Sequence, residues 1–330
     1  MSTLKSYYAE KKVLITGGAG FIGSNLAGRL ADLGSHVLLV DSLIPEYGGN
    51  LANIRGIEDR VKLNISDVRD EHSLRYLVKD QDILFNLAGQ TSHLDSMQRP
   101  NDDLEINSRA QLSILETCRH HNPGIRIVFA STRQLYGRPD YLPVDEKHPL
   151  RPVDVNGINK LAGEFYHLLY QQVYGIPTCV LRLTNTYGPR MRIRDARQTF
   201  LGIWIRHALQ GEPFEVWGGE QLRDLNYIDD VVAALLLTGE RPEAIGQVFN
   251  LGDTEVISLR RLAEILAEIV PAAHFNIREY PAERKKIDIG DFYSDFSKIK
   301  NLLGWEPTVS LTEGLRRTLD YYRPNLALYS

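Results

Sequence analysis

Short apolar runs alternate with longer amphipathic segments through the first half of the chain. The runs are rich in β-branched residues and predict buried strands at 13–16, 36–41, 61–67, 82–89, 125–131 and 178–185. Leu104–His121 and Asn159–Tyr174 have helical periodicity instead. Continuous apolar strands separated by helices are typical of a parallel sheet covered on both faces, so we expect an α/β, doubly wound fold.

The pattern changes after Asn185. The later segments predict a helix at 200–209, a strand at 214–217, a strand at 248–253, a helix at 259–270 and a less regular tail. We therefore expect two parts: a sheet domain over 1–185, to which 225–257 returns, and a smaller C-terminal α/β lobe built from 186–224 and 258–330.

Composition narrows the class of protein. A chain of 330 residues exceeds what one core usually supports, which favours two lobes. The formal charge of -4 argues against nucleic-acid and membrane partners. The polar start lacks a signal sequence and no run is long enough to span a membrane, so we expect a cytoplasmic protein. Cys118 and Cys179 stand in apolar stretches without metal-ligand spacing and predict buried free thiols.

The segment Gly17–Gly23 follows a predicted strand and opens a predicted helix. Gly17 permits a tight turn, Gly20 lets the backbone approach a pyrophosphate, and Gly23 allows close helix–strand packing. The helix N-terminus would supply N–H groups and a positive dipole end to phosphates. This context predicts a Rossmann domain that binds a dinucleotide; the alternative is a glycine turn without a ligand.

An acidic residue selects among dinucleotides. Asp41 ends the second predicted strand, 18 residues after Gly23, where it would bind ribose hydroxyls and repel a 2′-phosphate. The cofactor expected is therefore NAD. Asp67 and Val68 end the third predicted strand, either beside the adenine edge or in an ordinary turn.

The chain resembles the extended short-chain dehydrogenase/reductase family, in its nucleotide-sugar epimerase and dehydratase branch. Eight motifs occur in the family's order: ITGGAGFIG, NLAGQ, STRQLYG, NGINKLAGE, RLTNTYGPR, QLRDLNYIDD, FNLG and LGWEP. The resemblance covers nearly the whole chain and implies that the second lobe binds a nucleotide sugar. It also implies cofactor contacts at Phe21, Ile22, Ser42, Leu87, Ala88, Gly89 and Lys160.

In this family a Tyr-x-x-x-Lys pair and an upstream Ser or Thr carry the proton chemistry. Thr132 matches the Ser/Thr, and Lys160 matches the Lys that hydrogen-bonds the nicotinamide ribose. Asn156 stands where the family has its Tyr, and an amide does not titrate near neutral pH. Another group must act or the redox step is absent; the nearby candidates are Tyr136, His93, Asp95 and Asp154, each of which has a structural alternative such as packing or helix capping.

A second departure concerns the reaction. The dehydratases carry Asp and Glu after the Thr, whereas this chain has Arg133 and Gln134, which do not exchange protons at neutral pH. The resemblance then favours epimerisation, at C4 because that carbon is the commonest in the branch. A 2-epimerase, a decarboxylase, a dehydratase and a catalytically silent NAD or nucleotide-sugar sensor remain alternatives.

The late segments carry groups suited to a nucleotide diphosphate. Arg223 and Arg284 match family positions that contact the pyrophosphate, and a guanidinium suits phosphate oxygens. The other expected substrate contacts are Gln90, Ser92, Ser96, Asn185 and Arg192. No metal site is expected. The two amphipathic helices resemble those that pair in family dimers, so we expect a homodimer.

Overall fold

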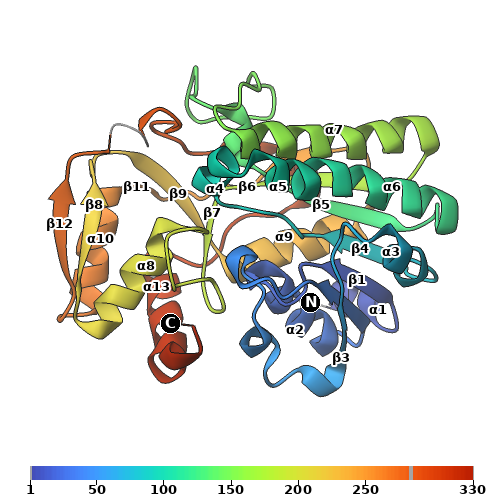
Figure 1. The fold of residues 1–330 in the computed structure, drawn as a ribbon, viewed down its shortest axis with the longest axis horizontal. Coiled ribbons are helices and arrows are strands. Elements are labelled where there is room, and N and C mark those ends of the chain that lie inside the picture. Colours follow the sequence, from blue (N-terminus) through green and yellow to red (C-terminus); the bar gives the residue numbers. More distant parts are fainter. Residues whose placement is uncertain (1, 282–284, 330) are drawn as a thin grey trace.

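A seven-stranded parallel sheet forms the centre of the molecule (Figure 1). The computed structural model describes residues 2–281 and 285–329. The strand order is β10-β6-β5-β4-β1-β2-β3, and every neighbouring pair is parallel. Its strands are β1 (Lys12–Thr16), β2 (His36–Asp41), β3 (Val61–Ile65), β4 (Ile83–Asn86), β5 (Arg126–Thr132), β6 (Thr178–Leu183) and β10 (Val248–Asn250).

Helices cover both faces of this sheet, which explains why its central strands are apolar throughout (Figure 1). One face carries α3 (Glu71–Leu77), α6 (Ala110–His121) and α7 (Val155–Tyr174). The other carries α1 (Ser2–Tyr8), α2 (Phe21–Asp32) and α9 (Ile228–Glu240). Two short helices, α4 (His93–Gln98) and α5 (Pro100–Leu104), lead into α6 and pack on α7.

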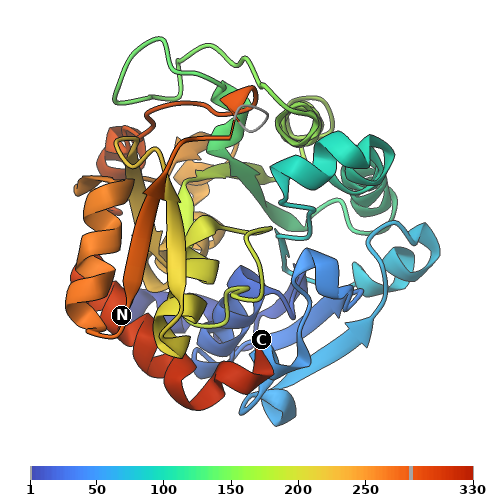
Figure 2. The same cartoon turned by 60° about the vertical axis from the view of Figure 1, so that its left-hand side comes forward.

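The second lobe lies beside one end of the large sheet (Figures 1 and 2). It contains a three-stranded sheet of β7 (Asn185–Tyr187), β9 (Leu222–Tyr227) and β11 (Val256–Ser258), and a parallel pair of β8 (Pro213–Trp217) and β12 (His274–Arg278). Its helices are α8 (Phe200–Gln210), α10 (Leu259–Ile269), α12 (Ser297–Leu303) and α13 (Leu311–Asn325).

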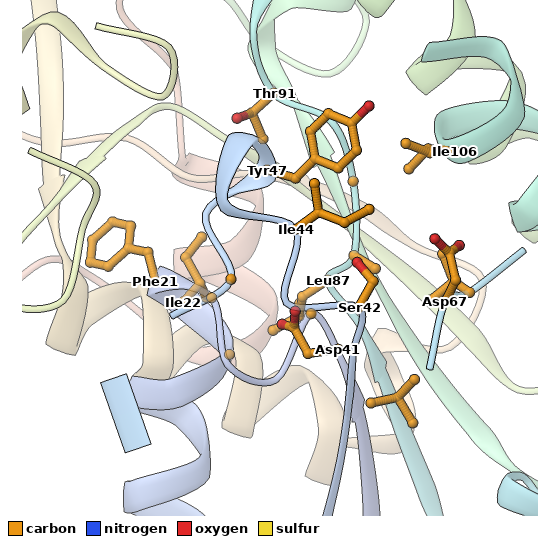
Figure 3. A pocket seen from close by; sticks show the side chains of 18 of the residues that line it. Phe21, Ile22, Asp41, Ser42, Ile44, Tyr47, Asp67, Leu87, Thr91 and Ile106 are labelled. Atoms are coloured by element: carbon orange, nitrogen blue, oxygen red, sulfur yellow. The ribbon is translucent and has the colours of Figure 1, made fainter. Parts of the chain in front are cut away.

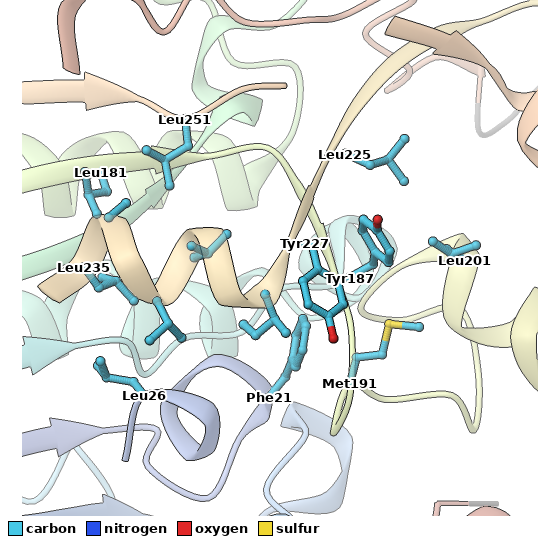
Figure 4. Packing of buried hydrophobic residues seen from close by; sticks show 14 of the residues in the cluster. Phe21, Leu26, Leu181, Tyr187, Met191, Leu201, Leu225, Tyr227, Leu235 and Leu251 are labelled. Carbon is cyan, nitrogen blue, oxygen red and sulfur yellow. The ribbon is translucent and has the colours of Figure 1, made fainter. Parts of the chain in front are cut away.

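One apolar cluster joins the two parts of the molecule. Phe21 opens α2, while Tyr187 and Tyr227 come from the small sheet, and their side chains approach one another in the same core (Figure 4). The Tyr187 and Tyr227 ring centroids are 5.6 Å apart in an edge-to-face arrangement, which aromatic pairs prefer. Helix α2, which follows the glycine loop, therefore packs against the second lobe.

The predicted fold class is confirmed, but several elements differ from expectation. The segment 104–121 is helical throughout as expected, but Glu105–Arg109 form a π-helical turn between α5 and α6 that the pattern did not predict. The run 178–185 breaks at Thr184 and yields β6 and β7. The tail is not irregular: α13 buries Leu315 and Leu319 on one face. Strand β9 and helix α9 were also missed.

The two cysteines are as expected. Cys118 and Cys179 are buried and form no disulfide, and burial raises the pKa of each thiol to about 12. No helix within 2–281 and 285–329 is both long and apolar enough to cross a membrane.

A buried ion pair ties α7 to the sheet. Arg182 on β6 donates from Nη2 to Glu164 Oε1 at 2.5 Å, and both side chains are almost fully buried. Ser131 Oγ donates to Glu164 Oε2 at 2.7 Å, and Arg182 Nη1 donates to the Tyr136 hydroxyl at 2.6 Å. The charges are neutralised by each other and by these neighbours.

We predict that Glu164→Gln destabilises the fold. Removing one partner of a buried pair leaves the other charge uncompensated, which costs about 3–5 kcal/mol. Urea denaturation measures the free energy of unfolding, and the Glu164→Gln/Arg182→Met double variant should recover part of the loss. A single-variant loss below ~1 kcal/mol would contradict this account.

Candidate functional site

The glycine loop has the tight geometry expected of a phosphate loop. Gly17 has a φ of 68°, and its N–H donates to Val40 O at 2.8 Å. A Cβ placed on Gly23 would lie 2.2 Å from Gly17 O, so the helix start cannot accept a larger residue without moving the loop. The N-terminal end of α2 therefore sits directly behind the turn, as anion binding requires.

Asp41 fixes the shape of this loop. Its Oδ2 accepts from Ala19 N–H at 2.9 Å and its Oδ1 accepts from Leu43 N–H at 2.8 Å. Burial raises the pKa of Asp41, and these two hydrogen bonds oppose the rise. A carboxylate has about four acceptor positions, so Asp41 can still receive hydroxyl hydrogens from a ribose.

A cavity opens above the loop, and Figure 3 shows its lining side chains. The expected cofactor residues that line it are Gly17, Gly20, Phe21, Ile22, Gly23, Asp41, Ser42, Asp67, Val68, Leu87, Ala88 and Gly89. Asp67 accepts two hydrogen bonds from the Arg69 guanidinium, which lower its pKa. The sequence missed Ile44 and Tyr47, because a short 3₁₀ turn after β2 brings them to this wall.

Lys160 lies beneath the floor of this cavity and is absent from its wall. Its Nζ donates to Ala130 O at 3.2 Å. A Cβ placed on Gly89 would lie 2.9 Å from both Lys160 Nζ and Asn107 Oδ1, so these two groups flank the end of β4. Burial lowers the pKa of Lys160 to about 8, which nearby Asp103 partly offsets.

Asn107 is a residue that the sequence did not single out. It stands in the π-helical turn, and its Nδ2 donates to Gln90 O at 2.9 Å. Its Oδ1 is buried and has no hydrogen-bond partner among the described residues. A π-helical turn is often associated with function, but no sequence signal for it was visible here.

Asn156 is buried and is absent from the wall of this cavity. Its Nδ2 donates to Gln90 O at 2.8 Å and to Asp103 Oδ2 at 3.0 Å. Asn159 Nδ2 donates to Asp103 Oδ1 at 2.8 Å, so one buried carboxylate holds two amides of α7. The residue in the family's Tyr position therefore belongs to a helix–helix contact.

The structure does not bring Tyr136 to the site. Its ring is fully buried, and its hydroxyl donates to Asn250 Oδ1 at 2.6 Å while accepting from Arg182. Burial raises the pKa of Tyr136 to about 12, which further disfavours proton exchange. Thr132 Oγ1 accepts from Gln134 N–H at 3.2 Å and lines neither cavity.

A second cavity of about 650 Å³ adjoins the first. Gln198 lines both, and the consecutive residues Thr91 and Ser92 line one each. Its wall combines loops at the carboxyl edge of the large sheet with residues of the second lobe. A ligand in the first cavity could thus present one end to a second ligand.

Cations dominate one side of this second cavity. Arg133 donates from Nη2 to Asn185 Oδ1 at 3.1 Å, and no carboxylate in the described ranges lies within ion-pair distance of it. Burial, with a smaller contribution from nearby Arg223, lowers the pKa of Arg133 to about 9, so it stays charged at neutral pH. Arg223 faces Asp288 at 3.6 Å, and Arg197 also lines the wall.

The expected substrate residues divide into two groups. Ser92, Asn185 and Arg223 line the second cavity. The structure does not place Gln90, Ser96 or Arg192 there, and Arg284 lies outside the described residues.

Local contacts explain the exceptions. Ser96 Oγ donates to His93 O at 2.7 Å, and Gln90 Nε2 donates to Ser92 O at 2.9 Å. Arg192 is held by Asp195 in a two-point contact, with 2.6 Å between Nη2 and Oδ2. Arg197, five residues later, lines the cavity instead and faces Asp95 at 3.4 Å; the loop conformation decides this.

Comparisons with known proteins agree with this architecture. A family model described as "NAD dependent epimerase/dehydratase family" matches residues 13–252. A putative UDP-glucose 4-epimerase of Methanocaldococcus jannaschii is 32% identical over 95% of this chain and 99% of its own length. UDP-glucuronic acid decarboxylase 1 of Xenopus tropicalis is 32% identical over 96% of this chain and 73% of its own.

Solved structures are similar over the same span. The UDP-glucose 4-epimerase of Thermotoga maritima, with UDP-glucose, has a TM-score of 0.88 at 31% identity and covers 96% of this chain and 99% of its own. The UDP-glucuronic acid 4-epimerase of Bacillus cereus, in complex with UDP-glucuronic acid and NAD, has a TM-score of 0.84 at 29% identity, with 95% and 99% covered.

We predict that Lys160→Met stabilises the apo fold at pH 7. A lysine pKa depressed from 10.5 to about 8 corresponds to roughly 3 kcal/mol of destabilisation while the group is protonated. The unfolded chain binds this proton more tightly, so the wild type regains the difference as pH rises from about 8 towards 10.5. Urea denaturation of both proteins without added nucleotide should show a gap that closes with pH; a gap independent of pH would contradict this.

Proposed function

This chain belongs to the NAD-dependent epimerase/dehydratase family, and we propose that it epimerises the sugar of a nucleotide-diphosphate sugar at C4. One observation carries the proposal: the cavity over the glycine loop adjoins, through Gln198, a larger cavity whose wall includes Arg133, Arg197 and Arg223. The first holds the phosphate loop and Asp41, which suit NAD. The second has room and charge for a sugar diphosphate.

Different residues of the chain bind the cofactor and the sugar nucleotide in this proposal. NAD, when bound, removes hydride from a sugar carbon and returns it to the opposite face. Asp41 and the glycine loop would bind and orient the dinucleotide, and Lys160 and Asn107, which stand beside Gly89, would help to hold it. Arg133, Arg197 and Arg223 neutralise the diphosphate, while Ser92 and Asn185 orient the sugar hydroxyls. In this proposal 1–185 with 225–257 holds NAD and contributes Ser92, Arg133 and Asn185 to the sugar-nucleotide site, which 186–224 with 258–330 completes.

The same geometry argues against water elimination. Gln134 Nε2 donates to Asp154 Oδ2 at 2.7 Å, and Arg133 is engaged with Asn185. Neither side chain can exchange a proton at neutral pH. Epimerisation needs one proton acceptor and no separate acid–base pair for elimination, so it fits these residues better than dehydration does.

A catalytically silent sensor of NAD or nucleotide sugar is a second candidate, and Asn156 favours it. The amide stands in the family's Tyr position and does not titrate near neutral pH, so it cannot accept the hydroxyl proton. Comparison with Asn156→Tyr separates the two functions: activity that appears only in the variant supports the sensor. Activity in the wild type supports the enzyme.

The proposed reaction predicts isomer formation from a panel of nucleotide sugars. Incubation of the wild type with UDP-, dTDP- and CDP-hexoses and hexuronates, read by proton NMR, should give a C4 isomer. The Gly23→Ala variant should lose bound NAD and turnover, because its Cβ would meet Gly17 O. Tight NAD and sugar binding without any isomer would overturn the enzyme proposal, and a product altered at C2 or C6 would reassign the reaction.

A homodimer forms part of the same proposal, as does a cytoplasmic location, which two buried free thiols support. Helix α7 exposes an apolar stripe: Phe165 is 52% exposed, Leu169 49% and Val173 58%. Residues three to four positions apart lie on one face of a helix, so this stripe is continuous. Exposed apolar patches of this kind favour association, here with a second copy.

We predict that Phe165→Glu/Leu169→Glu converts a dimer into a monomer. The two glutamate side chains would have to lose their hydration in an apolar interface, which opposes association. Light scattering should give a mass near twice 37.4 kDa for the wild type and near 37.4 kDa for the variant. Tyr76→Glu, at another exposed aromatic on α3, serves as the matched control and should stay dimeric. A monomeric wild type would contradict the prediction.

A further inference from the structure

The proposed epimerisation requires a group that accepts a hydroxyl proton when hydride leaves the same carbon. Asn156 cannot accept it, and Tyr136 is enclosed in the polar core. Lys160 has a depressed pKa, yet it lies on neither cavity wall among the described residues. The proton acceptor must therefore come from another element, and this inference rests on the proposed function.

His93 begins α4 and lines the second cavity. It stands two residues after Thr91, which lines the cofactor cavity, so it lies close to the junction of the two. Its side chain is 39% exposed, whereas the Asp154 carboxylate that it faces is fully buried. The distance from His93 Nδ1 to Asp154 Oδ2 is 3.0 Å, which leaves Nε2 as the nitrogen for the cavity.

Asp154 is held in place from three directions. Its Oδ1 caps α7 by accepting from Gly157 N–H at 2.7 Å, and its Oδ2 accepts from Gln134 Nε2 at 2.7 Å. Burial raises the pKa of Asp154, but the adjacent His93 side chain and the hydrogen bonds from Gly157 and Gln134 outweigh burial and lower the pKa. The Asp154 carboxylate thus faces Nδ1 of His93, so Nε2 is the ring nitrogen available to a ligand in the cavity.

Other titratable groups of this cavity are less suited. His207 lies on α8 in the second lobe, with Nδ1 3.0 Å from Pro213 O and Nε2 3.9 Å from Glu212. Asp288 faces Arg223 and also accepts from the Tyr280 hydroxyl at 3.2 Å. Neither group stands beside the residues that line the cofactor cavity, as His93 does.

We propose that His93 accepts the sugar hydroxyl proton in place of the absent Tyr, with Asp154 as its positioning residue. The O–H bond breaks and an Nε2–H bond forms as the carbon loses hydride to NAD, which gives a ketone and an imidazolium. After the keto-sugar turns, hydride returns to its other face and Nε2 gives the proton back to the oxygen. Protons and electrons balance over the cycle, and NAD is regenerated.

The first test replaces the imidazole. His93→Gln should lower kcat by about 10²–10⁴-fold, the usual contribution of a positioned acid–base group. NAD content and nucleotide-sugar affinity, measured by calorimetry, should change less than threefold (roughly a 0.7 kcal/mol limit). His36→Gln is the matched control, because His36 also pairs with a carboxylate, Glu10, at 3.0 Å but lies exposed at the start of β2.

Two additional measurements separate proton transfer from a structural role. Added imidazole should restore part of the turnover of His93→Ala and none of the turnover of Gly23→Ala. In the wild type, the ring resonances of His93 should shift when UDP-sugar is added, and the matching signals should be absent from His93→Gln. Unchanged turnover in His93→Gln, or an unshifted ring with sugar bound, would overturn the role of His93.

The second test concerns Asp154. Asp154→Asn keeps an oxygen that can cap α7 but loses the charge that orients His93, so kcat should fall at least about tenfold with KM nearly unchanged. A fall in kcat that a lower melting temperature of the variant accounts for, or an unchanged kcat, would overturn the positioning role of Asp154. If the wild type forms no isomer from any sugar, the proposed function itself fails; an active wild type with an active His93→Gln refutes only the dyad.

Discussion

Two buried carboxylates hold the first turn of α7, and the arrangement of the site depends on them. Asp103 accepts from the amides of Asn156 and Asn159, while Asp154 caps the helix and faces His93. A helix turn presents its side chains at set angles, so anchoring this one turn orients its neighbours together. Asn156 consequently faces α5, and His93 is held at the cavity wall.

The same helix brings charge into the interior one turn further on. Lys160 and Glu164 are four residues apart, on the face of α7 that packs on the sheet. Asp103 partly offsets the burial of Lys160, and Arg182 pairs with Glu164. Burying these charges demands such partners, because an unpaired buried charge is strongly destabilising. The position of Lys160 under Gly89 is therefore tied to the packing of the whole helix.

The fold was largely predictable because the central strands are apolar on both faces, and the glycine loop because it stands between a strand and a helix. The prediction failed for different reasons in different places. The π-helical turn with Asn107 follows no local pattern, whereas helix α13, capped by Ser310, and the Arg192–Asp195 pair form between residues close in sequence and were not predicted. Arg197 faces Asp95 at 3.4 Å and still lines the cavity, whereas Arg192 is held by Asp195 and does not; the loop conformation decides between them.

The sequence by itself determined that the chain has a dinucleotide loop with Asp41 and lacks a phenol four residues before Lys160, because both are properties of residue type and spacing. Only the tertiary structure decided which titratable group stands at the cavity. His93 opens α4 and Asp154 opens α7, and neither position predicts the other. Their 3.0 Å contact arises because α4 packs on α7 at the edge of the sheet where both loops meet.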